Sequence, residues 1–298
     1  MKKDLSRIKL IKVHGGRFHA DDVCCVAMLR LLNCSAPVEH VFEIKPEDDV
    51  PEIISFDLLH ADYDHHMPKD ECPTYPDGTH YASFGLFCKD LGFDTKYGEE
   101  FANVVKLIDN FDNGDKVPNK HFISELAMLL NPNWTEAPTK EDLEFAFNSA
   151  VDMIAHILKR IIIKSDSEIT AREEVTQALQ ESTSDIVILK RYVPWEKYIK
   201  SESGKFAVVY PDTRGGYTAK IVQGSRYALD KKLPEEWSGV AEKDLPEGIR
   251  FCSKNGDLLA GVDLDSVLRA LEKTVPYDAP HVSMPGPSLE MNTTSNFS

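Results

Sequence analysis

The sequence predicts an α/β protein: a parallel sheet with helices on both faces forms the first domain, and a smaller α+β domain follows it. Two observations predict this class. In the first half, short β-branched runs alternate with segments whose apolar residues recur at helical spacing. In the last third, strand-like runs follow one another before one amphipathic helix. At 298 residues and 42% hydrophobic content, the chain is long enough for two cores.

The first segment of the chain is predicted to form a strand, a polar loop and a helix, which together make half of a βαβ unit. The alternation continues along the chain, so the strands are expected to pair in parallel. Strands are expected over residues 8–13, 41–44 and 53–57, and helices over residues 23–32, 81–87 and 101–108.

The second half begins with a long helix that Thr139 can cap. Its apolar residues recur from Leu143 to Ile161, and the helix is expected to reach about Leu179. Strands are then expected over residues 186–189, 206–210 and 217–222, with a terminal helix over 264–271. The expected domains are 1–138 for the parallel sheet, 139–182 for a helical connector and 183–275 for the α+β domain. Residues 276–298 hold four prolines among Ser, Thr and Asn and are expected to be a disordered tail.

Charge and cysteine content narrow the class of protein. A net charge of −15 argues against general binding to duplex DNA, but bound cations can reverse the field locally. The six cysteines lack paired CxxC spacing, which is typical of reduced thiols. Lys9 and Lys12 interrupt the apolar run near the start, so it does not resemble a signal peptide, and no run approaches a membrane span. We expect a cytoplasmic protein without membrane contact.

Two polar clusters follow expected strands and indicate a divalent-metal site. The first is His14-Gly15-Gly16-Arg17-Phe18-His19-Ala20-Asp21-Asp22, and the second is Tyr63-Asp64-His65-His66. Parallel strands present such residues at one edge of a sheet. A two-metal phosphoesterase needs several hard ligands, one of them bridging. We expect one ion to be bound by His14, His19 and Asp21, and the second by Asp64 and His65. Asp57 is expected to bridge the two ions, and Asp109 or Asp112 to provide a further ligand.

Imidazole and carboxylate ligands without thiolate favour Mn²⁺, and two ions are expected; Mg²⁺, Fe²⁺, Co²⁺ or Zn²⁺ remain alternatives. Each group of candidate ligand residues also has an interpretation that involves no metal. His14 alone could be a hydrogen-bonded structural histidine, and His65 and His66 would point to opposite faces if extended. Asp109 and Asp112 could serve helix-end turn chemistry. The three clusters together favour the metal site.

Arg214-Gly215-Gly216 could form a phosphate clasp in the second domain. Glycine lets backbone N–H groups approach an anion, and arginine offers a planar, two-pronged donor. A tight hairpin turn explains the glycines equally well. Together with Arg214, Arg17 or His66 could hold the phosphate from the side away from the metal ions.

At these residues the chain resembles the DHH phosphoesterase superfamily and, within it, the melanocyte proliferating gene family of exonucleases. The stretch from His14 to Asp22 is similar to that family's H-N-G-x-F-H-x-D-E, and residues 64–66 to its Asp-His-His signature. Residues 206–217 and 233–239 resemble its F-x-V-x-P-D-x-R-G-G-Y and L-P-x-x-W-x-G motifs. The resemblance implies a DHH-type fold and a metal-dependent phosphodiester hydrolase with 3′ to 5′ RNA exonuclease activity. It also implies the metal ligands His14, His19, Asp21, Asp57, His65 and one of Asp109 or Asp112, with His66 contacting substrate.

The sequence therefore predicts a metal-dependent phosphodiesterase acting on single-stranded RNA or short oligonucleotides, with His66 and Arg214 in the catalytic machinery. Two alternatives stay open. One is a phosphohydrolase of a small molecule such as a dinucleotide, pyrophosphate or nucleotide. The other is a protein that binds metal or nucleotide without turnover. A homodimer is compatible with the sequence.

Overall fold

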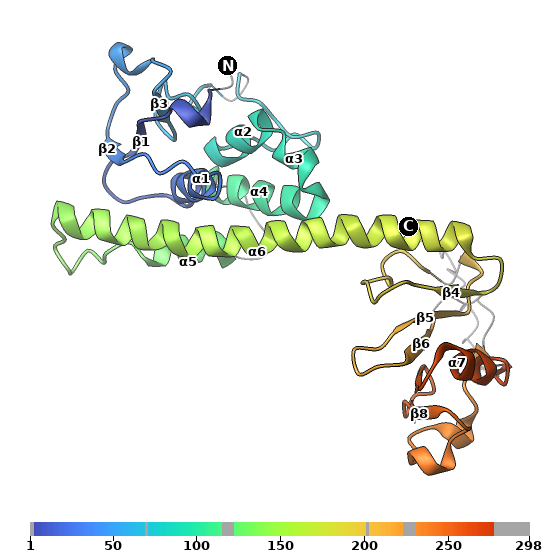
Figure 1. Ribbon diagram of the computed structural model, residues 1–298. Coiled ribbons are helices and arrows are strands. Elements are labelled where there is room, and N and C mark those ends of the chain that lie inside the picture. Colours follow the sequence, from blue (N-terminus) through green and yellow to red (C-terminus); the bar gives the residue numbers. More distant parts are fainter. Residues whose placement is uncertain (1–2, 69–70, 115–121, 201–202, 223–230, 277–298) are drawn as a thin grey trace, which may run out of the picture. The chain divides into compact units, whose positions relative to one another are not determined.

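The structure, a computed structural model, describes residues 3–68, 71–114, 122–200, 203–222 and 231–276 (Figure 1). The chain divides into two compact units, residues 1–170 and 171–298. All six cysteines are free and buried. Within the described ranges, no helix has both the length and the hydropathy needed to cross a membrane.

The first unit contains a parallel sheet in the order β2-β1-β3, formed by β1 (Leu10–His14), β2 (Val38–Val41) and β3 (Ile53–Ser55). Ile11 pairs with Val38 on one side of β1, and Leu10 pairs with Ile53 on the other. The expected α/β class with a parallel sheet is confirmed. The carboxyl ends of the three strands meet at one edge, where the polar clusters begin.

Helices pack together beside this sheet and share one apolar core with it. The first helix lies at the centre, since every residue from Ala20 to Leu29 is buried. The helices are α1 (Ala20–Leu31), α2 (Ser83–Asp90), α3 (Phe93–Lys96), α4 (Gly98–Asp112), α5 (Phe122–Leu129) and α6 (Lys140–Glu181). Thr139 caps α6 as expected, because its hydroxyl accepts the Asp142 N–H at 3.2 Å. Short 3₁₀ turns occur at η1 (Leu5–Arg7) and η2 (Pro46–Asp48).

The second unit contains a five-stranded sheet in the order β4-β5-β6-β9-β8, with β4 and β5 parallel and the other pairs antiparallel. The strands are β4 (Ile186–Ile188), β5 (Ala207–Pro211), β6 (Tyr217–Ile221), β8 (Ile249–Cys252) and β9 (Leu258–Gly261). Its helix α7 (Leu264–Leu271) has the predicted limits and packs Val267 and Leu271 into the core. The shorter elements are η4 (Glu235–Trp237), η5 (Glu242–Asp244) and the pair β7 (Lys231–Lys232) and β10 (Val275–Pro276).

The structure differs from the sequence-based expectation in several places. The strand expected over 41–44 begins earlier, because β2 pairs with β1 from Val38, and Phe42 leaves the sheet with 79% of its surface exposed. Four elements, α3, α5, β8 and β9, lie where no helix or strand was expected. Of the tail expected over 276–298, residues 277–298 lie outside the described part of the chain. The domain boundaries given above stay predictions.

Candidate metal centre

The loop between β1 and α1 is held in place from both ends. Gly15 donates its N–H to the Val41 carbonyl at 2.7 Å. Asn131, a buried residue just beyond α5, accepts the Phe18 N–H at 3.0 Å and donates to the Phe18 carbonyl at 2.9 Å. His19 then starts α1 as its N-cap residue. The loop therefore delivers His19 and the first turn of α1 to the carboxyl edge of the sheet.

Asp57 follows β3 in a conformation that few residues adopt. Its φ is +53°, in the left-handed region, which Asp and Asn tolerate better than most residues. Its N–H donates to the Ser83 hydroxyl at 3.0 Å, and that hydroxyl donates to the Tyr63 carbonyl at 2.7 Å. Ser83 also donates its own N–H to Asp21 at 3.2 Å. One buried serine at the start of α2 therefore joins three segments of the site.

The two neighbouring histidines both approach Asp57. Asp64 accepts the His66 N–H at 2.7 Å, which folds residues 64–66 into a turn. The turn explains why the two rings do not point to opposite faces, as they would in an extended chain. His65 Nε2 lies 2.9 Å from Asp57 Oδ1, and His66 Nε2 lies 3.7 Å from the same oxygen.

The C-terminal end of α4 contributes Asp112 to the same cluster. Its carboxylate lies 3.4 Å from His65 and 3.9 Å from His19, and it shares a hydrogen bond with Asp21. Asp109, one turn earlier, is instead held by the Tyr75 hydroxyl at 2.7 Å and the Gly85 N–H at 2.9 Å. Of the two carboxylates offered by the sequence, Asp112 joins the cluster.

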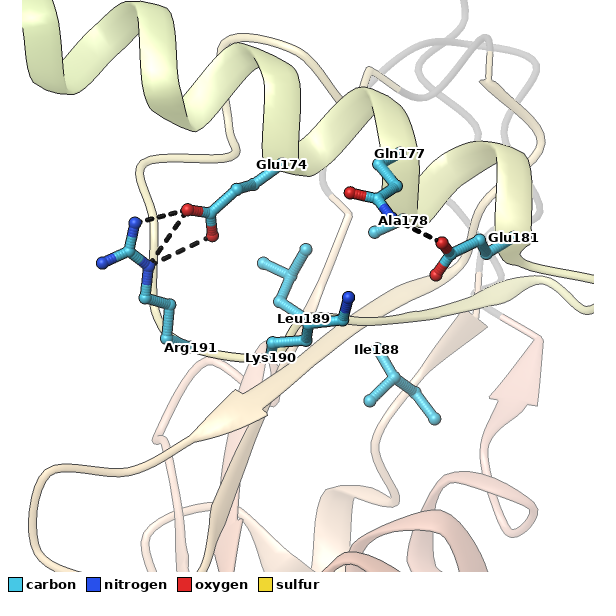
Figure 2. A pocket seen from close by; sticks show the side chains of 8 residues that line it. All are labelled: Glu174, Gln177, Ala178, Glu181, Ile188, Leu189, Lys190 and Arg191. Carbon is cyan, nitrogen blue, oxygen red and sulfur yellow. Dashed lines mark hydrogen bonds and ion pairs between the residues drawn. The ribbon is translucent and has the colours of Figure 1, made fainter.

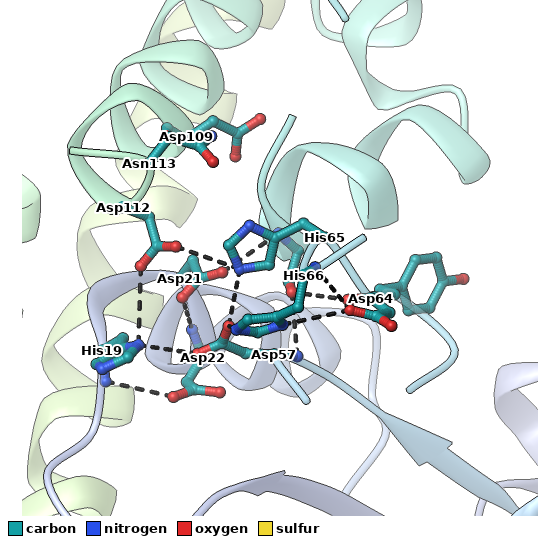
Figure 3. Close-up of polar contacts among 12 residues, drawn as sticks. His19, Asp21, Asp22, Asp57, Asp64, His65, His66, Asp109, Asp112 and Asn113 are labelled. Atoms are coloured by element: carbon teal, nitrogen blue, oxygen red, sulfur yellow. Dashed lines mark hydrogen bonds and ion pairs between the residues drawn. The ribbon is translucent and has the colours of Figure 1, made fainter. Parts of the chain in front are cut away.

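Three overlapping groups of side chains could each hold a divalent ion (Figure 3). Within each group the possible ligand atoms lie within 4.8 Å of one another, and Asp57 belongs to all three. The groups are Asp57, His65 and His66; His19, Asp21, Asp22 and Asp57; and Asp21, Asp57, His65 and Asp112. Figure 3 shows the Asp57 carboxylate between the imidazoles of His19 and His65.

Burial and crowding shift the pKa values of these groups in opposite directions. Burial, reinforced by the charge of Asp57, raises the pKa of Asp21 to about 6. Burial and the Asp21 charge raise the pKa of Asp112 to about 10. Burial also acts on Asp57, but hydrogen bonds from His19 and His65 prevail and lower its pKa to about 2. The raised pKa of Asp112 therefore favours its neutral form, while Asp57 stays charged and pairs with the imidazoles of His19 and His65.

The residues fit a divalent cation. Asp22 Oδ1 and His14 Nδ1 are buried and find no hydrogen-bond partner among the described residues, which is costly for polar atoms. The side chains of Asp21, Asp22 and Asp57 are at most 1% exposed, and a cation would supply the charge that they lack. The donor set contains imidazole nitrogens and carboxylate oxygens without thiolate, which suits Mn²⁺ and related ions.

Several predicted site residues lie outside these three groups. The His14 ring stacks on His19 with centroids 5.2 Å apart, so it borders the cluster. Asp64 holds the turn that positions His66 and also accepts the His60 N–H at 2.8 Å. Arg17 is exposed in the loop before α1.

Arg214, Gly215 and Gly216 belong to the second unit and form the tip between β5 and β6. Arg214 pairs with Asp212 through Nη2 at 3.0 Å and remains 75% exposed. Gly216 has a φ of +76°, and a Cβ there would lie 2.1 Å from the Gly261 carbonyl, so the turn itself requires glycine. The hairpin interpretation accounts for Gly216, while the exposed guanidinium stays available to an anion.

The second unit also has a pocket of about 340 Å³ between the C-terminal end of α6 and β4 (Figure 2). Its charged residues are largely paired: Arg191 Nε donates to Glu174 at 3.1 Å, and Gln177 donates to Glu181 at 2.7 Å. None of the predicted site residues lines it.

Sequence reasoning missed two residues of the cluster. Asp22 accepts the His19 N–H at 3.3 Å, a capping arrangement that the three-residue spacing between them could have suggested. Ser83 carries no sequence signal for its role, because it joins residues far apart in the chain.

Comparison with known proteins gives one family match over most of the chain. The sequence profile of an uncharacterised protein family (UPF0160), named MYG1_exonuc, matches residues 10–268. MYG1 exonuclease of Mus musculus is 28% identical over 301 aligned positions, which cover 81% of this chain and 77% of the mouse protein. A MYG1 protein of Chlamydia pneumoniae is 25% identical over 301 positions, covering 89% of this chain and 96% of that protein.

Solved structures give weaker matches. The pGpG-specific phosphodiesterase PggH from Vibrio cholerae is 11% identical, covers 89% of this chain and 96% of its own, and has a TM-score of 0.29. RecJ from Thermus thermophilus in complex with Mn²⁺ is 12% identical, covers 90% and 51%, and has a TM-score of 0.23. TM-scores this low do not establish a common architecture for the whole chain.

Proposed function

We propose that this chain, which belongs to the MYG1 exonuclease family (UPF0160), removes nucleotides from the 3′ end of short single-stranded RNA with two Mn²⁺ ions bound around Asp57. Membership of this family, whose relatives include MYG1 exonucleases, supports a phosphoesterase, and the dependence on a metal ion belongs to the proposal. The polymer, the direction of cleavage, the choice of Mn²⁺ and a cytoplasmic location belong to the proposal.

The single observation that carries the proposal is the sharing of Asp57 by all three ligand groups. A carboxylate common to overlapping groups is what a bridging ligand between two ions requires. Hydrogen bonds from His19 and His65, each 2.9 Å long, already fix both oxygens of Asp57. We assign Asp112, rather than Asp109, as the further carboxylate ligand.

When bound, such ions supply an activated water and stabilise charge on the phosphoryl oxygens. The protein residues would position the substrate and exclude bulk water from the site. At neutral pH the raised pKa of Asp112 keeps a proton on its carboxyl, which it must release for ligation, whereas Asp21 holds a proton only below about pH 6. His66 is 43% exposed at the solvent side of Asp57, where it would donate a hydrogen bond to the phosphate. Arg17, exposed on the loop before α1, would add positive charge.

The acidity of the chain favours a second candidate, hydrolysis of a small phosphorylated molecule such as a dinucleotide. A net charge of −15 repels a long polyanion more strongly than a short one. A length series of single-stranded RNA separates the two: an exonuclease keeps its rate as nucleotides are added, whereas a dinucleotide specialist loses it steeply.

The proposal is tested by measuring hydrolysis of short RNA and DNA strands, labelled at either end, with and without Mn²⁺. We expect Asp21→Asn to lower kcat at least 100-fold and Asp265→Asn, a change at an exposed residue of α7, to leave kcat unchanged. Wild-type activity in Asp21→Asn, or no metal-dependent hydrolysis of any strand by the wild type, would refute it.

Arg214 is the proposed phosphate contact from the second unit, with the backbone of Gly215 and Gly216 beside it. Arg214→Ala should raise KM for short RNA about 10-fold with little change in kcat, because the residue would bind substrate without taking part in bond cleavage. Since Arg214 is 75% exposed, its removal should leave the urea midpoint of unfolding nearly unchanged. Steady-state kinetics and urea unfolding check both expectations, and an unchanged KM would restrict this tip to a structural turn.

A further inference from the structure

A large aromatic side chain stands exposed at the rim of the candidate metal centre. Phe42 follows the last residue of β2, at the same carboxyl edge of the sheet as His14 and Asp57, and is 79% exposed. A single exposed apolar residue is ordinary in itself. The position and contacts of this ring distinguish it from the other exposed aromatic residues of the unit.

The ring lies directly on the loop that carries the site. A Cβ on Gly15 would come within 2.9 Å of Phe42 Cζ, so the absence of a side chain at Gly15 lets the ring rest on the main chain. Its edge meets the His14 ring, with centroids 6.2 Å apart and planes at 80°. His14 in turn stacks on His19, whose Nδ1 lies 2.9 Å from Asp57. A row of three rings therefore leads from the metal cluster to solvent and ends at Phe42.

This arrangement suits a nucleotide. Its phosphate and its base lie at opposite ends of the ribose, so a phosphate at the cluster brings the base towards the rim. An exposed aromatic ring there offers a face on which any base can stack, and such stacking tolerates different sequences. Arg17, exposed two residues beyond Gly15, offers a cationic group on the same loop.

We propose that Phe42 is a stacking platform for the nucleobase next to the phosphate that is cleaved, and that it makes the site selective for nucleotides over other phosphate esters. The proposal rests on the proposed function, because it assumes a phosphate at the cluster. Stacking on a neutral ring adds affinity without requiring positive charge. In a chain with a net charge of −15, that contribution offsets weak attraction for the polyanion.

The test compares binding of AMP with binding of ribose 5-phosphate, by calorimetry in the presence of Ca²⁺. Loss of one base–aromatic stack weakens binding by about 5- to 100-fold. We expect the wild type to prefer AMP by a factor in that range and Phe42→Ala to lose the preference through weaker AMP binding alone. Phe42→Tyr should keep it, and Phe42→Leu, which keeps an apolar side chain without a π-face, should not.

Phe145→Ala is the matched control, because Phe145 is a similarly exposed phenylalanine on α6, at 76%. It should bind both compounds like the wild type. Equal weakening of AMP and ribose 5-phosphate by Phe42→Ala would indicate a disturbed loop and overturn the proposal, as would an unchanged preference.

Kinetics separate this inference from the proposed function. On a dinucleotide and its counterpart lacking the terminal base, Phe42→Ala should lower kcat/KM only for the complete substrate. If the wild type cleaves both but Phe42→Ala cleaves them at wild-type rates, the platform is refuted and the phosphodiesterase stands. If the wild type cleaves neither while the AMP preference still depends on Phe42, the phosphodiesterase is refuted and Phe42 is a base-stacking platform of a nucleotide-binding site without cleavage.

Discussion

Replacing Asp57 by asparagine should abolish metal binding while leaving the fold intact. The substitution keeps the size of the side chain, and asparagine tolerates the left-handed φ of +53° at this position. It removes the charge of the only side chain shared by the three ligand groups identified among the described residues. Metal affinity and folding stability therefore respond very differently to this single change.

The cost to the metal-free protein is small. The fall of the Asp57 pKa from 3.8 to about 2 corresponds to about 2 kcal/mol of folding stability. Because the pKa is lowered, this contribution is complete above pH 4 and is lost as the pH falls towards 2. Removing the Asp57 charge also relieves its repulsion of Asp21, Asp22 and Asp112. The net loss at pH 7 should therefore not exceed about 2 kcal/mol.

The cost to the metal-bound protein is larger. At a free Mn²⁺ concentration 100 times the Kd, binding stabilises the wild type by about 2.7 kcal/mol. For a unit of this size, that corresponds to a rise in Tm of roughly 5–10 °C. The Asp57→Asn variant should show almost none of this rise, and calorimetry should find its Mn²⁺ affinity at least 100-fold weaker.

Asp64→Asn serves as the matched control for thermal unfolding with and without Mn²⁺. Asp64 accepts backbone N–H groups from His60 and His66 and belongs to none of the three groups. We expect its variant to keep the Mn²⁺-dependent rise in Tm. A full rise in Asp57→Asn would refute the assignment of Asp57 as the shared ligand, and loss of the rise in Asp64→Asn would restore the sequence-based expectation that Asp64 binds metal.

Two further predictions concern the charge and the packing around the cluster. Mn²⁺ affinity should increase between pH 6 and 8, and binding should release at least one proton. The reason is that the raised pKa values of Asp21 and Asp112 make the folded metal-free protein hold protons that the ion must displace. Calorimetry in buffers of different ionisation enthalpy counts the released protons, and a count of zero would contradict the assignment. The same raised values predict that metal-free stability falls as the pH rises above about 4. Gly85→Ala should lower the free energy of unfolding by about 2 kcal/mol instead of stabilising α2, because the new Cβ would lie 1.8 Å from Asp109 Oδ2. Urea unfolding measures this loss of stability, and the loss should be smaller when Gly85→Ala is made in an Asp109→Ala background. A stabilised Gly85→Ala would show that the Asp109 side chain moves away from the new methyl group.

Local patterns predicted the parts of the fold in which one periodicity dominates. Helix α6 runs from Lys140 to Glu181 because apolar residues recur along it after a capping threonine, and α7 has the expected limits from Leu264 to Leu271. Strand β2 was misplaced because the residues after Val41 are as apolar as those before it. Only pairing with β1, which begins at Val38, decides where that strand lies.

The candidate site was predictable where residues cluster in sequence and much less so where they meet only in space. His19, Asp21 and His65 lie in compact motifs, and the structure brings them together. Nothing local distinguishes Asp109 from Asp112, because both end the same helix. The choice depends on Tyr75 and Gly85, which hold Asp109 away from the cluster.

The balance of charge in the cluster supports the proposal that it binds a cation. Four carboxylates gather with three imidazoles in the ligand groups of the described structure, and the side chains of Asp21, Asp22 and Asp57 are at most 1% exposed. Protons can relieve the repulsion, as the pKa of Asp112 near 10 indicates, but they leave Asp22 Oδ1 and His14 Nδ1 without partners. A divalent cation relieves the repulsion at several oxygens at once, because each ligand keeps its charge and shares the same ion. The burial that makes the metal-free cluster costly would therefore increase the affinity for a cation, and under the proposal the same side chains that destabilise the metal-free protein would be its ligands.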